Sequence, residues 1–120
     1  MRGLPFAFLL LGVISVLIGM AWGIQMSASG DHSLSPAHAH LNLLGYVSFF
    51  LFALYYHAVP AAVGRLAQVH FAVALAGVVV LVPGIVMAIT GTGEALAKSG
   101  SLLTLVSMLI FLAVVIRSRA

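Results

Sequence analysis

The sequence predicts an all-α integral membrane protein, built as an up-down bundle of four transmembrane helices. Of its 120 residues, 63% are hydrophobic and only 6% are charged, whereas about 25% of the residues in soluble domains are charged. The few charged residues fall between four long uncharged stretches. A chain of this length holds a single domain, residues 1–120. This composition excludes a soluble enzyme, a disordered tail and a module that binds nucleic acid.

Four spans are expected, at residues 4–25, 36–59, 66–90 and 99–116. Crossing the hydrocarbon core of a bilayer, ~30 Å thick, takes roughly 20 helical residues. The first three stretches meet this length, and the fourth is the shortest. Its start is therefore expected near Lys98.

The connections between the spans carry residues that favour turns and helix ends. Residues 27–33 form a polar loop, and Pro36 falls in the first turn of the second helix, where its missing N–H costs nothing. Pro60 ends the second helix, and the Gly-Thr-Gly sequence at 91–93 ends the third. In the first span, Gly19 and the glycine four residues later form a G-x-x-x-G pair that predicts a close contact between helices.

The distribution of basic residues predicts the orientation. Four arginines lie at the termini and in the turn at residues 60–65: Arg2, Arg65, Arg117 and Arg119. The other two connections carry only Lys98, together with Asp31 and Glu94. The positive-inside rule then places both termini in the cytoplasm of a bacterial-type inner membrane. A cleaved signal peptide is the alternative for the first span. Its apolar run of about 21 residues exceeds the usual 7–15, so a retained helix is expected.

Histidine is the unusual residue in so apolar a chain. Four of the five histidines lie in or at the edge of the expected spans: His38, His40, His57 and His70. Ionisable residues inside membrane spans are functional candidates by default. The strongest local pattern is the His-x-His pair of His38 and His40, near the outer face. Side chains at i and i+2 of a helix point about 200° apart, so this pair faces two different spaces and does not chelate one metal. Two interfacial histidines that only reach headgroups and water are the plainer alternative.

A haem b is the cofactor that best suits two imidazoles pointing apart in an apolar setting. The chain has no cysteine, and a catalytic zinc site needs three converging ligands with acidic neighbours. Haem takes axial histidine ligands and fits an apolar slot. Asn42 continues the His38 face, and Trp22 and Gln25 of the first span lie level with the histidines. We therefore expect His38 and His40 as iron ligands with these three residues beside the cofactor. No methionine-rich motif favours copper.

The segments HAHLNLLGY and VSFFLFALYYH, with Val69-His70-Phe71 at the start of the third span, resemble small four-helix membrane proteins related to haem–copper oxidase subunit I. In subunit I, one helix carries His-x-His near its outer end, and its imidazoles ligate two different haems on opposite sides. The resemblance runs from about residue 35 to residue 117. It implies that the chain corresponds to a third of a twelve-helix ring. A homotrimer would rebuild that ring, with His38 of one copy and His40 of the next on either side of one haem.

The sequence departs from that family at the oxygen-reducing centre. Subunit I places histidines around a copper ion, and one of them is cross-linked to a tyrosine. No equivalent cluster is found beside Tyr46, Tyr55 or Tyr56. A bound haem is therefore expected to serve electron transfer, haem handling or gas sensing. Whether the chain is an enzyme at all is left open.

The remaining candidates have plainer structural explanations. Trp22 is typical of the aromatic belt at a membrane boundary, and His32 in the outer loop is expected to be solvated. His57 and His70 lie across the inner turn, with His57 roughly 25 Å along the helix axis from His40, too far to share a cofactor. Both are expected to be ordinary hydrogen-bonded histidines. A second metal site is the alternative for His70.

Two functions from different classes follow from the sequence. The first is a haem b protein that contacts lipid, further copies of itself and a respiratory-chain partner. The second is an accessory or assembly subunit of a respiratory membrane complex, with no cofactor and with its histidines in an interface. A transporter is disfavoured, because the sequence shows neither a buried charge nor an inverted repeat. Haem content discriminates between the first two.

Overall fold

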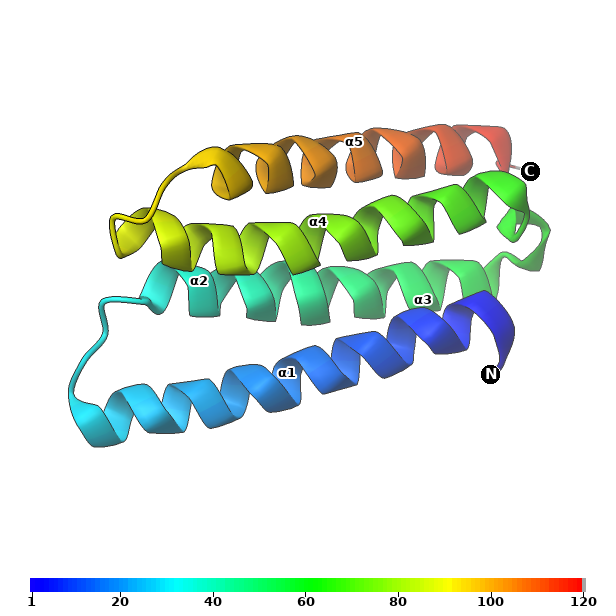
Figure 1. Cartoon of the computed structure of the whole chain (residues 1–120). Coiled ribbons are helices and arrows are strands. Elements are labelled where there is room, and N and C mark those ends of the chain that lie inside the picture. Colours follow the sequence, from blue (N-terminus) through cyan, green and yellow to red (C-terminus); the bar gives the residue numbers. More distant parts are fainter. Residues whose placement is uncertain (120) are drawn as a thin grey trace.

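The computed structural model describes residues 1–119 and is helical throughout its long elements (Figure 1). The elements, in chain order, are α1 (Gly3–Ser29), α2 (Ser35–His40), the π-helical η1 (Leu41–Val47), α3 (Ser48–Ala58), the short 3-10 helix η2 (Pro60–Ala62), α4 (Arg65–Ile89) and α5 (Ala95–Arg117). Since α2, η1 and α3 form one continuous helix, four helices are long and apolar enough to cross a membrane. This confirms the expected all-α chain with four apolar spans.

The first helix is longer at its carboxyl end than the sequence predicted. α1 continues through Ser29, so residues 27–29, expected as loop, form its last turn. Gly30 ends the helix with φ 73°, and its N–H donates to the carbonyl oxygen of Met26. This left-handed conformation is easily reached by glycine alone. The helix therefore runs to the first residue that can close it.

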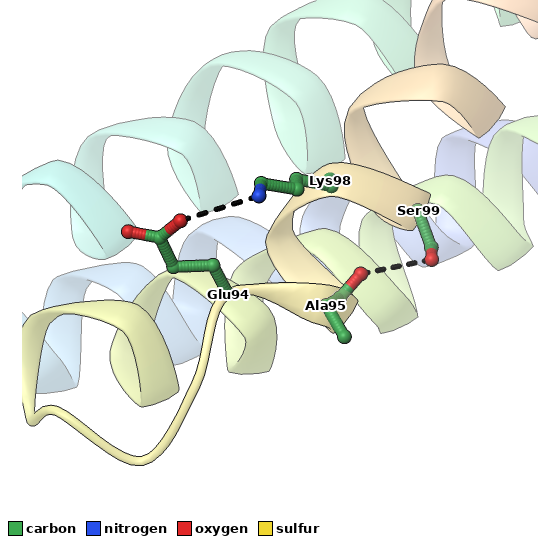
Figure 2. Close-up of polar contacts among 4 residues, drawn as sticks. All are labelled: Glu94, Ala95, Lys98 and Ser99. Carbon is green, nitrogen blue, oxygen red and sulfur yellow. Dashed lines mark hydrogen bonds and ion pairs between the residues drawn. The ribbon is translucent and has the colours of Figure 1, made fainter.

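The fourth helix also begins earlier than expected, at Ala95 and not near residue 99. Figure 2 shows its first turn, in which Glu94 pairs with Lys98 at 3.4 Å and the Ser99 hydroxyl donates to the carbonyl oxygen of Ala95 at 2.8 Å. The sequence-based expectation started this helix at the charged residue Lys98, where the apolar segment begins. A helix continues past the apolar segment into the polar interface, because its backbone hydrogen bonds do not depend on side-chain polarity.

The second helix contains a π-helical segment that the sequence did not reveal. Leu41–Val47 follows directly after His40, and the N–H of Ser48 donates to the carbonyl oxygen of Leu43, five residues earlier. Gly45 lies buried in this segment against Ser15 of α1, where an added Cβ would be 2.8 Å from the serine hydroxyl. The wider winding shifts the faces of α3 relative to those of α2. Such segments occur frequently at functional sites.

The long helices run antiparallel to their chain neighbours and lie side by side in the order α1, α2–α3, α4, α5 (Figure 1). Aromatic rings from all four meet in a cluster toward the end of the bundle that holds both termini: Phe8, Phe49, Phe52, Tyr55, Tyr56, His70, Phe71 and Phe111. Burial of these large rings packs the four helices against one another at this end.

Small residues bring α4 and α5 close together. A Cβ added at Gly84 would lie 2.5 Å from the backbone nitrogen of Ala97, and one added at Gly100 would lie 2.5 Å from the Cα of Leu81. Lipid chains are as apolar as the helices, so association in a membrane depends on such close backbone packing. This close packing of α4 against α5, the α4–α5 seam, therefore holds α5 against the rest of the bundle.

Candidate functional site

The His38 side chain of α2 packs against α1. Its Nε2 lies 2.9 Å from the carbonyl oxygen of Gly19. A carbonyl only accepts, so Nε2–H is the donor. The indole of Trp22 meets the imidazole edge to face, with ring centroids 6.0 Å apart. An added Cβ at Gly23 would lie 3.3 Å from the same Nε2. The G-x-x-x-G pair of α1 thus makes its close contact within the chain, against the His38 side of the second helix.

Asn42 lies on the same face of the second helix as His38. Its amide nitrogen is 3.4 Å from His38 Nε2, and its buried Oδ1 has no partner among the described residues. An amide N–H and an imidazole N–H both donate, and the Nε2 proton of His38 is already given to the Gly19 carbonyl, so this contact is close packing. Both side chains pack against Gly19 of α1.

His40 lies on the exposed side of α2, away from α1. Its Nδ1 is 2.6 Å from the carbonyl oxygen of Pro36, one turn earlier. Because the carbonyl accepts, Nδ1 carries the proton and the neutral ring keeps a lone pair on Nε2. A histidine that ligates a metal typically has this arrangement, in which one ring nitrogen donates to a fixed oxygen and the other binds the ion. The two histidines face different spaces, as their i, i+2 spacing predicts.

The remaining residues of the expected cofactor site are only partly brought together. Trp22 contacts His38, whereas Gln25 lies exposed on α1 and takes part in none of the hydrogen bonds of the described histidines. Within residues 1–119, no group of three or more His, Asp or Glu side chains is placed to hold a metal ion. His40, and His32 in the preceding loop, each offer an unused ring nitrogen on an exposed surface, and of these two only His40 lies within a long helix.

His70 occupies a different environment, in the aromatic cluster. It is fully buried, and its Nδ1 lies 2.9 Å from the hydroxyl of Tyr56. Three phenylalanine rings lie 4.5–5.3 Å from its ring: Phe8, Phe52 and Phe111. Its Nε2 is buried without a partner among the described residues. His57 is exposed near the end of α3, so the structure does not join these two histidines in a metal site.

Sequence reasoning missed the Tyr56–His70 pair, although a signal was present. Both residues lie seven positions from Val63, in the turn between α3 and α4. Residues equally far from a turn come to the same depth when two helices run antiparallel. The spacing alone, however, does not say which face each helix presents to the other.

The loop between α1 and α2 is polar and exposed. The Asp31 carboxylate accepts a hydrogen bond from the backbone N–H of Ser33 at 3.0 Å. This bond and the nearby imidazole of His32 hold the pKa of the Asp31 carboxyl below its usual range. His32 is itself exposed, with its Nδ1 3.3 Å from the carbonyl oxygen of Gly30. The expected solvated histidine is found here.

The fold places the chain in the class of all-α proteins with four apolar helices, as expected of an integral membrane protein. No protein-family model, curated protein or solved structure matches the chain. The case for its function therefore depends on the geometry of His38 and His40.

Proposed function

We propose that the chain is a haem b-binding membrane protein in which His40 supplies an axial ligand to the iron. The observation that carries the proposal is the hydrogen bond from His40 Nδ1 to the carbonyl oxygen of Pro36. That bond fixes the ring and leaves Nε2 with a free lone pair on an exposed face. A bound haem b would supply one-electron chemistry or an iron that binds gases. The proposed role is electron transfer, haem handling or gas sensing.

The surface beside His40 suits a flat apolar ring system. Leu43 and Val47, on the next turns of the same helix, are exposed apolar side chains, and Ala39 leaves space beside the imidazole. His40 is also close to the start of the helix at Ser35. An apolar macrocycle can therefore lie along the helix with its charged propionates directed to the polar end.

The second axial ligand defines the bis-His form of the proposal. Within one chain the two imidazoles face apart, so His38 and His40 of the same copy do not bind one iron from its two sides. His38 of another copy supplies the second ligand in a homotrimer, the assembly implied by the resemblance to a third of haem–copper oxidase subunit I. To bind iron, that His38 would give up the hydrogen bond to the Gly19 carbonyl, 2.9 Å from its Nε2, and carry its proton on Nδ1.

The first test is an absorption spectrum of the detergent-purified protein, air-oxidised and then reduced with dithionite. We expect sharp reduced α and β bands and about one haem per chain. His40→Ala is expected to lower haem content about tenfold or more. His57→Ala, an exposed histidine on the same long helix, is the matched control and keeps the pigment. A wild-type protein that stays colourless after expression with added haem would overturn the proposal, as would full haem content in His40→Ala.

A second variant, His38→Ala, tests the bis-His form. If His38 is the other ligand, the protein retains haem but loses the sharp low-spin α band. An unchanged spectrum would show that His38 is not a ligand and serves only to pack α2 against α1. The two outcomes are read from the same preparation by haem content and band shape.

The second candidate function is an accessory or assembly subunit of a respiratory membrane complex, with no cofactor. The observation that favours it is the hydrogen bond between His38 and Gly19, which already gives one of the two histidines a structural role. In this case the purified chain forms stable colourless oligomers, and His40→Ala leaves both their stability and their co-purification with a membrane complex unchanged.

A further inference from the structure

A cavity of about 280 Å³ opens at the end of the bundle that holds both termini, between the turn after α3 and the last turn of α5. Its polar lining is made by Arg65, Arg117 and Ser118, and its apolar walls include Leu66 and Val114. The volume lies just below the range for small-molecule sites, about 300–1,000 Å³. The residues that line the cavity lie at the end of the bundle with both termini, whereas α2, which carries His40, lies toward the other end (Figure 1).

The charges around this cavity are all of one sign among the described residues. Arg65 comes from α4 and Arg117 from α5, so two separate helices each bring a guanidinium to the same space. The two acidic residues of the chain lie at the opposite end, where Asp31 is in the α1–α2 loop and Glu94 pairs with Lys98. The cavity therefore has an electrostatic preference for an anion.

The backbone adds to this preference. α4 begins at Arg65, and Gly64 before it offers no side-chain cap, so the first N–H groups of α4 remain available beside the cavity. Ser118 donates its hydroxyl proton to the carbonyl oxygen of Val114 at 2.7 Å and accepts from the Tyr55 hydroxyl at 2.6 Å, so it lines the cavity without offering it a donor. A tetrahedral oxyanion suits this set, since each guanidinium forms paired hydrogen bonds to phosphate oxygens.

We propose that this cavity binds the phosphate group of an anionic phospholipid, held between Arg65 and Arg117. The shared chemistry is that of any phosphate ester. A lipid is favoured because the cavity combines apolar walls with a position where the apolar helices end. Exposed apolar side chains lie one to two turns deeper on both helices, at Val69 of α4 and Leu112 of α5. These give acyl chains a surface that a free phosphate does not use.

The test measures lipid binding to the full chain by native mass spectrometry, with phosphatidylglycerol and phosphatidylcholine compared at equal concentration. We expect the anionic lipid to bind in preference to the neutral lipid. Arg65→Gln/Arg117→Gln is expected to weaken phosphatidylglycerol binding about tenfold or more. Arg119→Gln is the matched control, an arginine at the same end that does not line the cavity, and it is expected to change binding less than twofold.

Three outcomes overturn the proposal. Equal binding of the two lipids removes the role of the headgroup charge. Equal losses in Arg119→Gln and in the double variant show a diffuse charge effect and no site. Competition by inorganic phosphate at the concentration of the lipid shows a free-phosphate site. Arg117→Lys keeps the positive charge but removes the planar guanidinium that forms two hydrogen bonds to a phosphate. A loss of phosphatidylglycerol binding between those of the wild type and the double variant supports these two hydrogen bonds, even if the double variant folds poorly.

Discussion

Tyr56 and His70 form a polar pair inside the apolar bundle. Their contact of 2.9 Å joins α3 to α4 among aromatic rings. In either tautomer of the neutral imidazole, Nε2 is left without a partner. A buried hydrogen bond contributes about 0.5–1.5 kcal/mol net, whereas an unsatisfied buried group costs about 1–3 kcal/mol. The pair therefore positions the two helices and adds little to stability.

The pair makes a stability prediction. Tyr56→Phe leaves both ring nitrogens of His70 unpaired and is expected to lower the free energy of unfolding by about 1–3 kcal/mol. Tyr56→Phe/His70→Phe removes the polar groups from both sides and is expected to recover most of that loss. Denaturant unfolding in detergent, followed by circular dichroism, measures both. A double variant less stable than the single variant contradicts this account and indicates a further partner for His70.

Asp31 makes a pH prediction. Its folded-state pKa is lowered, first by the hydrogen bond from the Ser33 N–H, so its contribution to loop order is present above the unfolded pKa. That contribution is lost as the pH falls through the folded pKa. NMR titration is expected to give a carboxyl pKa below the usual range, and the protection of the Ser33 amide from exchange, relative to its intrinsic rate, is expected to fall below that pKa. Asp31→Asn abolishes that pH dependence; a titration at the usual pKa contradicts the hydrogen bond.

At the scale of elements, glycines decide how closely the helices approach. Gly84 and Gly100 let α4 and α5 meet backbone to backbone, and Gly19 makes room for Asn42 of the second helix. The π-helical segment then divides that helix into two parts whose side chains point in different directions. α2 presents His38 to α1 and His40 to the exposed side, whereas α3 directs Phe52 and Tyr56 into the core.

The α4–α5 seam predicts the effect of one added methyl group. In Gly100→Ala, the new Cβ would lie 2.5 Å from the Cα of Leu81, so the helices must move apart. The gain in helix propensity is about 1 kcal/mol, and overpacking costs about 1–3 kcal/mol, so a net loss of stability is expected. Thermal unfolding in detergent compares it with Ser101→Ala, at the next and exposed position. Stability at or above that of the control would show that the seam has space.

At the scale of the whole molecule, the antiparallel order collects the basic residues at one end. Both termini and the α3–α4 turn lie there (Figure 1), and they carry Arg2, Arg65, Arg117 and Arg119. The positive-inside rule predicts that this end faces the cytoplasm. With that orientation, the proposed haem ligand and the proposed lipid site would lie near opposite faces of the membrane.

This orientation is testable because the natural chain has no cysteine. Single cysteines are introduced in intact cells, Ser33→Cys in the α1–α2 loop and Val63→Cys in the α3–α4 turn. A membrane-impermeant maleimide is expected to label the first and not the second. Labelling of Val63→Cys occurs only after the cells are opened. The reverse pattern contradicts the orientation. If both cysteines are labelled in sealed cells, a cytoplasmic control protein is examined, and labelling of that protein identifies a leaky preparation.

The sequence by itself determined the properties that depend on composition and on geometry within one helix. Four apolar stretches separated by charges require four helices, because a backbone in lipid must satisfy its own hydrogen bonds. The opposed directions of His38 and His40 also follow from the angle per residue of a single helix. Helix ends were less predictable: Gly30 rather than polarity ended α1, and α5 began before Lys98.

The tertiary structure alone decided which side chains meet. In the folded chain, His38 Nε2 donates to the Gly19 carbonyl, whereas His40 Nε2 has no partner among the described residues. His70 is buried beside Tyr56. Arg65 and Arg117 line one cavity. Each of these pairings except that of His40 joins residues from different helices. Such contacts depend on the rotation of each helix about its axis, which is set by close packing at glycines and by the π-helical segment. Neither is recorded in hydropathy or charge.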